Sequence, residues 1–372
     1  MVLLLGLAII LTLATIVQLW FWGVRFRGLV KYRGGPPADG PAVDRPLSVI
    51  ICAHNEAEKL RRNLPYFLNQ AYPDYEVIVV DDHSTDETAQ VVLSFQKKHP
   101  TLVLLKPEGV TPPGKKAALS WGIQNARFEW LVLSDADCRP AGPHWLQHIA
   151  RQFQRGAYLV LGFSPYSRRR GWLNRFLRFE AFYTAIQYLS FALARDPYMG
   201  VGRNLAYHRS VFRRAAGFST HAHLMGGDDD LFVNQVAKTT PTRIVVHPDS
   251  FVYSEPVTTW KSYYYQKRRH LSVSRHYQLR HQWLLGALSL SHATHYGLMV
   301  ILLVLAPSWW PFIAMNYLAR MVVVCRTGAP LLRRLDAEDL IPFLPLLDLA
   351  YLAFYFCFAP ALITGSSTRQ WK

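Results

Sequence analysis

Cysteine is scarce in this sequence, which has four in 372 residues. No two of them are spaced as Cys-x-x-Cys, and two lie in apolar segments. We infer neither a disulfide framework nor a cysteine zinc site. The chain is long enough to bury a sizeable core instead, in one domain of ~250 residues with membrane segments beside it.

Charged side chains are absent from residues 2–22, and acidic ones are absent from residues 256–335. An uncharged apolar run as long as the first can cross a bilayer, which needs roughly 20 residues. It lacks the basic start and the small-residue cleavage site of a secretory signal, so residues 1–24 are predicted to form an uncleaved anchor. The basic residues follow the run instead, at Arg25, Arg27, Lys31 and Arg33. The positive-inside rule then places the N-terminus outside and the residues from Arg25 onward in the cytoplasm.

The C-terminal part holds three more apolar stretches, at about 283–306, 308–325 and 340–364. They predict a transmembrane helical region over residues 282–372. Asp348 lies in the last stretch, where a carboxylate is either a functional group or a partner of Arg320 or of a neighbouring hydroxyl, and we favour the pairing. Four crossings would put the basic C-terminus outside, against the positive-inside trend, so a re-entrant or interfacial last stretch is the alternative.

The net charge of +16 is compatible with a nucleic acid or with an anionic membrane face as partner. The basic clusters adjoin apolar segments, so we expect the lipid bilayer and no nucleic acid. One cluster is the helix predicted over residues 168–192, where arginines alternate with aromatic residues. This helix either lies in the headgroup layer of a membrane or packs its aromatic side chains on the sheet. Its one acidic residue, Glu180, is a candidate to face the acceptor.

Strand and helix patterns alternate in the first half of the chain. Short apolar runs predict strands at 47–52, 76–80, 101–105 and 131–133. Helical patterns lie between them at 56–70, 86–99 and 113–125, with Pro65 as a kink or break in the first. This β-α-β-α alternation predicts an α/β domain with a mostly parallel sheet. Glycine and proline before the first strand mark a linker, which together with the basic residues after the anchor spans 25–46.

Three of the predicted strands end in polar clusters, at residues 53–56, 81–86 and 134–137. One such cluster is commonly the cap of the next helix, but three at one edge of a sheet predict a nucleotide site. Ligands of such sheets bind beyond the carboxyl ends of the strands. Asp135 and Asp137 point to one side of an extended chain, and two hard oxygen donors suit Mg or Mn held jointly with phosphates.

These motifs resemble those of the family 2 glycosyltransferases of the GT-A fold. The resemblance rests on four segments in the family's order, namely Ser48–Glu56, Val80–Asp86, Gly114–Leu119 and Ser134–Asp137. It extends over about residues 47–281 and implies a Rossmann-like GT-A catalytic domain between the membrane segments. His83 stands where the family usually has glycine, a modest departure next to the residue expected to contact the base.

The resemblance implies a nucleotide-sugar donor. Asp82 would accept a hydrogen bond from its base, Glu56 would lie near its ribose, and Lys115 would approach the nucleotide. Asp137 would be the principal metal ligand, with Asp135 facing the nucleotide sugar and sharing the Mg or Mn. The residues expected at the nucleotide sugar are Ala53, Glu56, Asp82, Lys115, Asp135, Arg203 and Asn204.

The resemblance also implies a catalytic carboxylate in the segment Gly226–Phe232. Position 227 is glycine where the family commonly has an acidic residue, so the base aligns with Asp228, with Asp229 as the alternative. Such a base takes the proton of the acceptor hydroxyl as the bond to the anomeric carbon forms.

A last motif resembles the family's Gln-x-x-Arg-Trp. Gln266 and Arg269 match it, whereas His270 replaces the tryptophan. Arg269 would contact the diphosphate and Gln266 would help to shape the acceptor site. The loss of the tryptophan removes a stacking surface, which leaves the nature of the acceptor open.

The sequence therefore predicts a membrane-embedded inverting glycosyltransferase with a cytoplasmic catalytic domain. We expect a UDP-sugar as donor and a lipid-type hydroxyl, in a glycolipid, carotenoid or similar terpenoid, as acceptor. A base favours a hydroxyl acceptor, because a polyprenyl phosphate needs no deprotonation. A processive polysaccharide synthase is the alternative among enzymes. A membrane-anchored nucleotide-sugar-binding or scaffold protein without catalysis is the alternative outside them.

Overall fold

The chain forms two compact units that interleave along the sequence. The computed structural model describes residues 1–34, 45–107, 109, 112–224, 226–271 and 273–364. A sheet unit comprises the described parts of Arg33–Arg169 and Arg195–Val257, and a helical unit comprises those of Met1–Tyr32, Arg170–Ala194 and Thr258–Ser366. Each unit is described by itself below.

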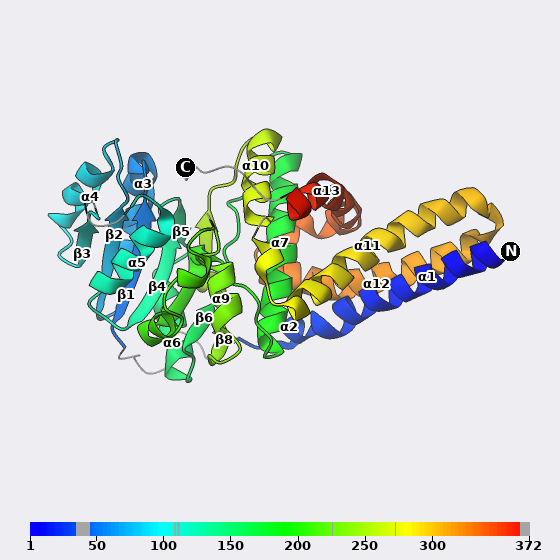
Figure 1. The fold of residues 1–372 in the computed structure, drawn as a ribbon, viewed down its shortest axis with the longest axis horizontal. Helices are drawn as coiled ribbons and strands as arrows, with labels where there is room; N and C mark the ends of the chain where they lie inside the picture. The colour runs from blue at the N-terminus through cyan, green and yellow to red at the C-terminus, as the bar shows by residue number, and fades with distance from the viewer. Residues whose placement is uncertain (35–44, 108, 110–111, 225, 272, 365–372) are drawn as a thin grey trace. The chain divides into compact units, whose positions relative to one another are not determined.

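A seven-stranded sheet is the centre of the sheet unit (Figure 1). Its strands, in spatial order, are β3 (Leu102–Leu105), β2 (Tyr75–Asp81), β1 (Leu47–Ala53), β4 (Trp130–Asp135), β7 (Leu205–His208), β6 (Leu159–Leu161) and β8 (Thr242–Ile244). The first four are parallel, β7 is antiparallel to both of its neighbours, and β8 is parallel to β6. The predicted α/β fold with a mostly parallel sheet is therefore confirmed. The strands β6, β7 and β8, which include the antiparallel part, were not among the strands that we predicted.

Helices and a small second sheet complete this unit. The helices are α3 (Ala57–Leu68), α4 (Thr88–Gln96), α5 (Lys115–Asn125), α6 (Trp145–Gln154), α8 (Arg209–Arg214) and α9 (Asp230–Val236). Three single turns of 3₁₀-helix are η2 (Gly202–Asn204), η3 (Ser219–His221) and η4 (Pro248–Ser250). The second sheet pairs β5 (Cys138–Pro140) with β9 (Val252–Ser254). Pro65 does not break its helix, because α3 continues through it to Leu68.

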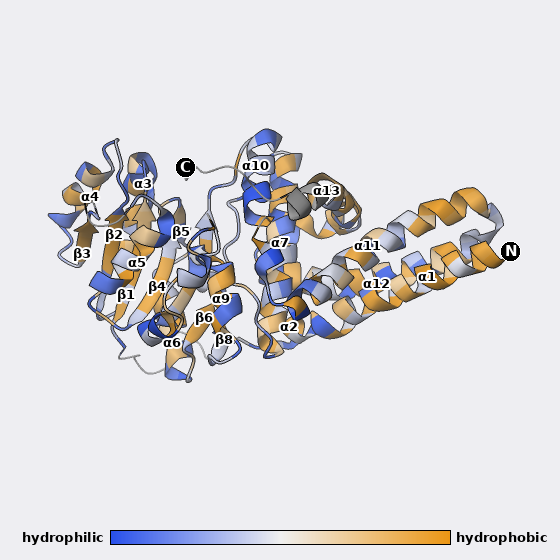
Figure 2. Cartoon of the chain, viewed as in Figure 1, coloured by the Kyte–Doolittle hydropathy of each residue, from blue (hydrophilic) through white to orange (hydrophobic). Residues whose placement is uncertain are grey.

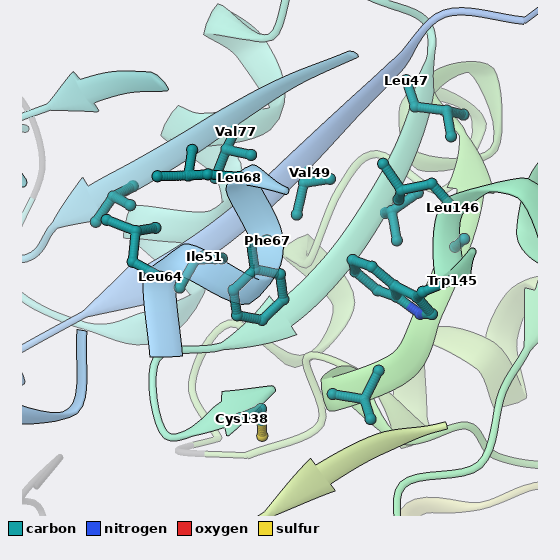
Figure 3. Close-up of a cluster of buried hydrophobic side chains, with 14 of the residues drawn as sticks. Leu47, Val49, Ile51, Leu64, Phe67, Leu68, Val77, Cys138, Trp145 and Leu146 are labelled. Carbon is teal, nitrogen blue, oxygen red and sulfur yellow. The ribbon is translucent and has the colours of Figure 1, made fainter. Parts of the chain in front are cut away.

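The apolar core of the sheet unit lies between β1 and the helices α3 and α6 (Figure 3). All seven residues of β1 are buried, as expected for a central parallel strand covered on both faces. Phe67 of α3 meets Trp145 of α6 edge to face, with ring centroids 5.6 Å apart. Burial of each such large side chain stabilises the fold by about 1.5–3 kcal/mol. The core thus fixes the strand whose carboxyl end leads into the polar clusters.

The helical unit contains long apolar helices. Its elements are α1 (Val2–Trp20), the π-turn η1 (Phe21–Arg25), α2 (Arg27–Lys31), α7 (Trp172–Leu193), α10 (Trp260–Leu271), η5 (Ser274–His276), α11 (Leu279–Leu305), η6 (Pro307–Trp309), α12 (Trp310–Arg334), η7 (Glu338–Phe343) and α13 (Leu344–Thr364). Among the described residues, three segments are long and apolar enough to cross a membrane, namely Val2–Lys31, Leu279–Leu305 and Glu338–Phe358. The helices α1, α11 and α12 lie side by side, and hydrophobic residues run along them (Figures 1 and 2).

Two predicted boundaries need correction. The predicted linker begins too early, because residues 25–31 continue the first apolar helix with almost no interruption and the chain becomes extended only at Tyr32. Residues 35–44 of the predicted linker lie outside the described part. The domain predicted over 47–281 is interrupted, since α7 and α10 belong to the helical unit.

The aromatic face of α7 is buried inside the helical unit. Phe176 lies 5.8 Å from Trp260 and 6.3 Å from Tyr351, measured between ring centroids. Tyr183 stacks on Trp22 at 5.8 Å. Phe176 and Tyr183 of the segment 168–192 thus pack against other helices of their own unit, and the interfacial position of this segment stays a prediction.

Glu180 also has a partner within this unit. Its Oε2 forms an ion pair with Nζ of Lys267 in α10, at 2.6 Å. Its Oε1 accepts a hydrogen bond from the Thr184 hydroxyl at 3.1 Å. Glu180 is buried. These contacts make Glu180 part of the α7–α10 packing, and its role at an acceptor stays a prediction.

The carboxylate of Asp348 is paired among the apolar helices. Arg320 of α12 donates to both of its oxygens, at 2.6 and 3.0 Å, and the Tyr296 hydroxyl of α11 donates at 2.7 Å. Gln18 of α1 accepts from the same guanidinium at 3.1 Å. The favoured pairing of Asp348 with Arg320 and a hydroxyl is therefore confirmed.

Candidate functional site

The ends of three parallel strands bring the predicted polar clusters to one edge of the sheet. In the register of β1 with its neighbours, Ala53 lies opposite Asp81, and Cys52 lies opposite Asp135. Asp82 directly follows β2, and its backbone N–H donates to the Ala53 carbonyl at 2.8 Å. The first segments of the motif pattern thus meet where a ligand of such a sheet binds.

Lys115 joins the predicted metal motif to the predicted base. Its Nζ lies 3.0 Å from Asp135 Oδ1 and 3.1 Å from Asp228 Oδ2. Gly114, with φ at +150°, turns the chain into α5 so that Lys115 begins the helix. Burial alone would lower the pKa of Lys115, but the carboxylates of Asp135, Asp228 and Asp229 raise it well above its usual value. The lysine is therefore a fixed positive charge at the centre of an acidic site.

The two candidate bases have different surroundings. Asp229 is engaged by the backbone, because its carboxylate accepts from Gly202 N–H at 2.7 Å and from Asp230 N–H at 2.8 Å as the cap of α9. Burial, and then the charge of Asp228, raise its pKa. Asp228 faces Lys115 instead; burial alone would raise its pKa, but the lysine holds it below the usual value. Asp228 is therefore the carboxylate that is ionised and turned into the site.

Asp135 and Asp137 fit a hard divalent metal ion. One ligand atom each from Asp135, Asp137 and Cys138 lie within 4.8 Å of one another. Burial, and then the two carboxylates, raise the pKa of the Cys138 thiol well above its usual value, so it stays neutral and donates to Asp137 Oδ1 at 3.2 Å. A neutral thiol is a poor ligand for Mg or Mn, which leaves the two carboxylates as the donors.

Arg203 supplies a second cation near this pair. Its guanidinium carbon lies 5.0 Å from the ring centre of Tyr166. Burial would lower its pKa, but Tyr166, Cys138, Asp137 and Asp135 raise it. A guanidinium held beside two carboxylates suits a diphosphate that arrives together with a metal ion.

Asp82 is buried and held from two sides. Gly114 N–H donates to its Oδ2 at 2.9 Å, and Nδ1 of His83 lies 3.0 Å from its Oδ1. His83 adopts φ of +56°, a conformation that glycine adopts without strain, which explains why glycine is usual at this position. A base contact at Asp82 would therefore compete with the His83 ring.

The two remaining residues of the first motif lie at the same edge. Glu56 is partly buried and pairs with Lys59 at 2.7 Å; burial raises its pKa, against the pull of the lysine. Ala53 is buried, and its carbonyl is taken by Asp82. Both residues lie at the predicted edge of the sheet, and their contact with a nucleotide stays a prediction.

Asn204 has a structural role, in contrast to its predicted place at the nucleotide sugar. It is buried, and its Nδ2 donates to the carbonyls of Phe163 and Ser250, both at 2.8 Å. Its Oδ1 accepts from Trp145 Nε1 at 3.0 Å. A Cβ at Gly162 would lie 2.4 Å from the Asn204 amide, so this glycine is needed for the close approach. Both polar atoms of the Asn204 amide thus have hydrogen-bond partners within the protein.

Gln266 and Arg269 lie on α10, in the helical unit, whereas the other predicted site residues lie in the sheet unit. The Oε1 atom of Gln266 is buried without a hydrogen-bond partner among the described residues. The catalytic roles of these two residues stay predictions.

Two residues that position the site were not assigned a role from the sequence. Asn55 has φ of +55°, and its Oδ1 accepts from Thr85 N–H at 2.8 Å, which ties the loop after β1 to the loop after β2. Lys116 donates to the carbonyls of His221 and Leu224, at 2.5 and 2.9 Å, in the segment that leads to Asp228. Both lie within the motifs that we had singled out, but contacts with backbone groups far away in the sequence leave no signal in it.

Comparison with known proteins agrees with this geometry. The model of glycosyl transferase family 2 matches residues 48–215. A probable glycosyltransferase YdaM of Bacillus subtilis is 26% identical over 236 residues, which are 60% of this chain and 54% of the relative. A beta-monoglucosyldiacylglycerol synthase of a Nostoc species is 29% identical over 152 residues, 40% of this chain and 31% of the relative. A poly-beta-1,6-N-acetyl-D-glucosamine synthase of Staphylococcus epidermidis is 32% identical over 91 residues, 24% and 21% of the two chains.

The chain thus spans about half the length of the first of these relatives, and less of the other two.

Among solved structures, a mannosyltransferase of Pyrobaculum calidifontis in complex with GDP-Man and Mn²⁺ matches with a TM-score of 0.57 and 22% identity. The match covers 94% of this chain and 99% of that protein. This likeness shows a shared fold and confirms the predicted GT-A architecture.

Proposed function

Residues 48–215 belong to glycosyl transferase family 2, and from this premise we propose that the protein is a membrane-embedded inverting glycosyltransferase. It moves a sugar from a nucleotide-sugar donor to the hydroxyl group of a lipid acceptor. The observation that carries the proposal is the contact of one partly buried lysine, Lys115, with both Asp135 and Asp228. That contact supports the proposal, because it brings together the residues that we propose for the donor side and for the base of a displacement reaction.

The roles follow from the charges of the residues. Asp228 accepts the proton of the acceptor hydroxyl as its oxygen bonds to the anomeric carbon. The bond from that carbon to the diphosphate breaks on the opposite side, so one displacement inverts the centre and no covalent enzyme intermediate is needed. Lys115 and Arg203 stabilise the negative charge that develops on the departing nucleoside diphosphate.

Asp135 and Asp137 would hold a Mg or Mn ion, which supplies further positive charge to the leaving diphosphate. The mannosyltransferase of the same fold is in complex with Mn²⁺. Its donor there is GDP-Man, so a GDP-sugar is the alternative to the UDP-sugar that we propose first.

A lipid acceptor is supported by two observations. In the described part of the chain, three helical segments have the length and composition to cross a membrane, and one relative is a glucosyldiacylglycerol synthase. We place the N-terminus outside and the sheet unit in the cytoplasm, because the basic residues Arg25, Arg27 and Lys31 follow the first apolar run. The similarity to a poly-N-acetylglucosamine synthase supports a second candidate, processive polymer synthesis, for which product length is the test.

The experiment is sugar transfer by the full chain in detergent. Radiolabelled UDP- and GDP-sugars are screened with total membrane lipid and Mn²⁺, with wild type and with Asp228→Asn. We expect a labelled lipid-soluble product that is absent from the variant, and mass analysis of that product gives the acceptor and the number of sugars. If both proteins bind a donor but neither releases nucleotide with any acceptor, the scaffold interpretation replaces this proposal.

A further inference from the structure

A second cluster of potential metal ligands lies in the sheet unit, outside the donor site. One ligand atom each from His148, His247 and Asp249 lie within 4.8 Å of one another. His148 comes from α6, while the other two flank and enter the turn η4. The rings of His148 and His247 stack, with centroids 4.1 Å apart and an angle of 23° between their planes.

The His148 ring is prepared for a ligand that the protein does not supply. The residue is 5% exposed, and its Nε2 has no hydrogen-bond partner among the described residues. A buried polar atom without a partner is unfavourable by about 1–3 kcal/mol, so such atoms are rare unless something binds them.

The partners of His148 can complete a ligand set. Nδ1 of His247 accepts a hydrogen bond from the Asp249 N–H at 3.2 Å, which is long for such a bond. A metal ion can therefore replace this N–H and bind the same nitrogen lone pair. Asp249 adds a carboxylate with negative charge. His144 precedes His148 by four residues, and its buried Nδ1 is also without a partner in the described part of the chain.

We propose that His148, His247 and Asp249 form a binding site for a divalent transition metal ion such as Zn²⁺, separate from the carboxylate site for Mg or Mn. Two imidazoles and one carboxylate suit Zn²⁺, with a fourth position for water or another ligand. The donor site offers hard oxygens, which suit Mg or Mn instead. The two sites thus differ in the class of ion that they select.

The expected consequence of binding is to fasten η4 to α6. The turn contains Ser250, whose carbonyl accepts from Asn204, the neighbour of Arg203. A metal ion that joins His148 to the turn would therefore stabilise the segment that supports the donor site. The ion takes no part in the transfer itself.

The test is Zn²⁺ binding by the full chain in detergent, stripped with a chelator and free of any histidine tag. Binding is followed by calorimetry, by metal content after dialysis and by thermal unfolding. His148 is buried, and its substitution can unfold the protein, so the main variant is His247→Asn. Asparagine can still cap η4 through its side-chain oxygen but removes the imidazole. Asp249→Asn is the second variant, His99→Ala is the matched histidine control, and Asp137→Asn is the control for the donor site.

We expect one Zn²⁺ per chain with a rise in the unfolding temperature for wild type, His99→Ala and Asp137→Asn. The affinity should fall at least about tenfold in His247→Asn and Asp249→Asn, because even the outer contacts of metal ligands are worth that much. Any shift that Mn²⁺ causes at the same concentration should come from the donor site, so it should be kept in His247→Asn and lost in Asp137→Asn. Equal Zn²⁺ binding by wild type and His247→Asn, loss of binding in Asp137→Asn, or no binding at all would overturn the proposal.

Discussion

Each unit of this protein contains a carboxylate paired with a cation, and the surroundings of the two pairs differ. In the helical unit, Arg320 and Asp348 are 1% and 2% exposed, and Tyr296 and Gln18 take up their remaining hydrogen bonds. In the sheet unit, the side chain of Lys115 is 24% exposed and that of its partner Asp135 is 27% exposed. The first pair is closed by the protein, whereas the second leaves charge directed to an arriving ligand. The same pairing chemistry therefore serves packing in one unit and binding in the other.

The largest effect is expected on the rate of sugar transfer in Asp228→Asn, which tests whether the site in the sheet unit is catalytic. Loss of a general base lowers the transfer rate by about 10²- to 10⁴-fold, while donor affinity stays close to that of wild type. Asp229→Asn is the matched control, because that carboxylate is bound by backbone N–H groups and its loss should weaken folding more than catalysis. Transfer assays with folded fractions measured by circular dichroism check both. If Asp229→Asn is folded but inactive in transfer while Asp228→Asn remains active, Asp229 is the base in place of Asp228.

The closed pair is tested by stability. Arg320→Met or Asp348→Leu alone leaves one charge buried without its partner, which costs about 3–5 kcal/mol of unfolding free energy. The double variant should recover most of this loss, because a well-packed apolar replacement of a buried pair is often neutral. Chemical denaturation in detergent measures all three. A double variant as unstable as the singles would mean that Gln18 and Tyr296 depend on the charges.

A third test separates packing from binding inside the sheet unit. Asn204→Ala leaves Trp145 Nε1 and the Ser250 carbonyl without the Asn204 amide, at about 1–3 kcal/mol each when buried. The Phe163 carbonyl loses one donor but keeps the Val252 N–H at 3.3 Å. The variant should unfold at a lower temperature, with little change in the Michaelis constant for the donor at temperatures where it is folded. A large rise in that constant without loss of stability would restore Asn204 to the donor site.

The sequence was sufficient to predict the parallel half of the sheet and the edge where the polar clusters meet. The strands there are runs of four to seven residues that alternate with helices, and the clusters follow three of the strands directly. The antiparallel half could not be predicted, because β6 and β8 have three residues each, too few for a periodic pattern.

Contacts between distant segments account for the other differences. Asn204 and Glu180 contact Trp145 and Lys267, which lie far away in sequence. The aromatic residues of α7 show a helical period, but the period cannot say against which partner they pack. The interleaving of the two units follows from that packing, so local patterns placed α7 and α10 in the wrong unit.

A smaller effect is expected on the pH dependence of transfer. Lys115→Met removes the charge that holds the pKa of Asp228 below its usual value, so that pKa rises in the variant. The base works when ionised and loses activity as the pH falls through its pKa; the acidic limb of the rate profile should therefore move to higher pH. Profiles of kcat/KM for wild type and variant measure the shift. An unchanged acidic limb would show that another group titrates there.

The smallest effect is expected from an ion pair that neither unit buries. Arg61 of α3 contacts Glu58 at 2.7 Å and Glu87 at 3.2 Å, and its side chain is 50% exposed. Water and salt screen such pairs, so Arg61→Ala should cost about 0.2–1 kcal/mol of unfolding free energy, and less at high salt. Denaturation at two salt concentrations, beside the Arg320 and Asp348 variants, measures the difference. If Arg61→Ala lowers the unfolding free energy as much as the Arg320 and Asp348 variants do, burial does not determine how much an ion pair stabilises this protein.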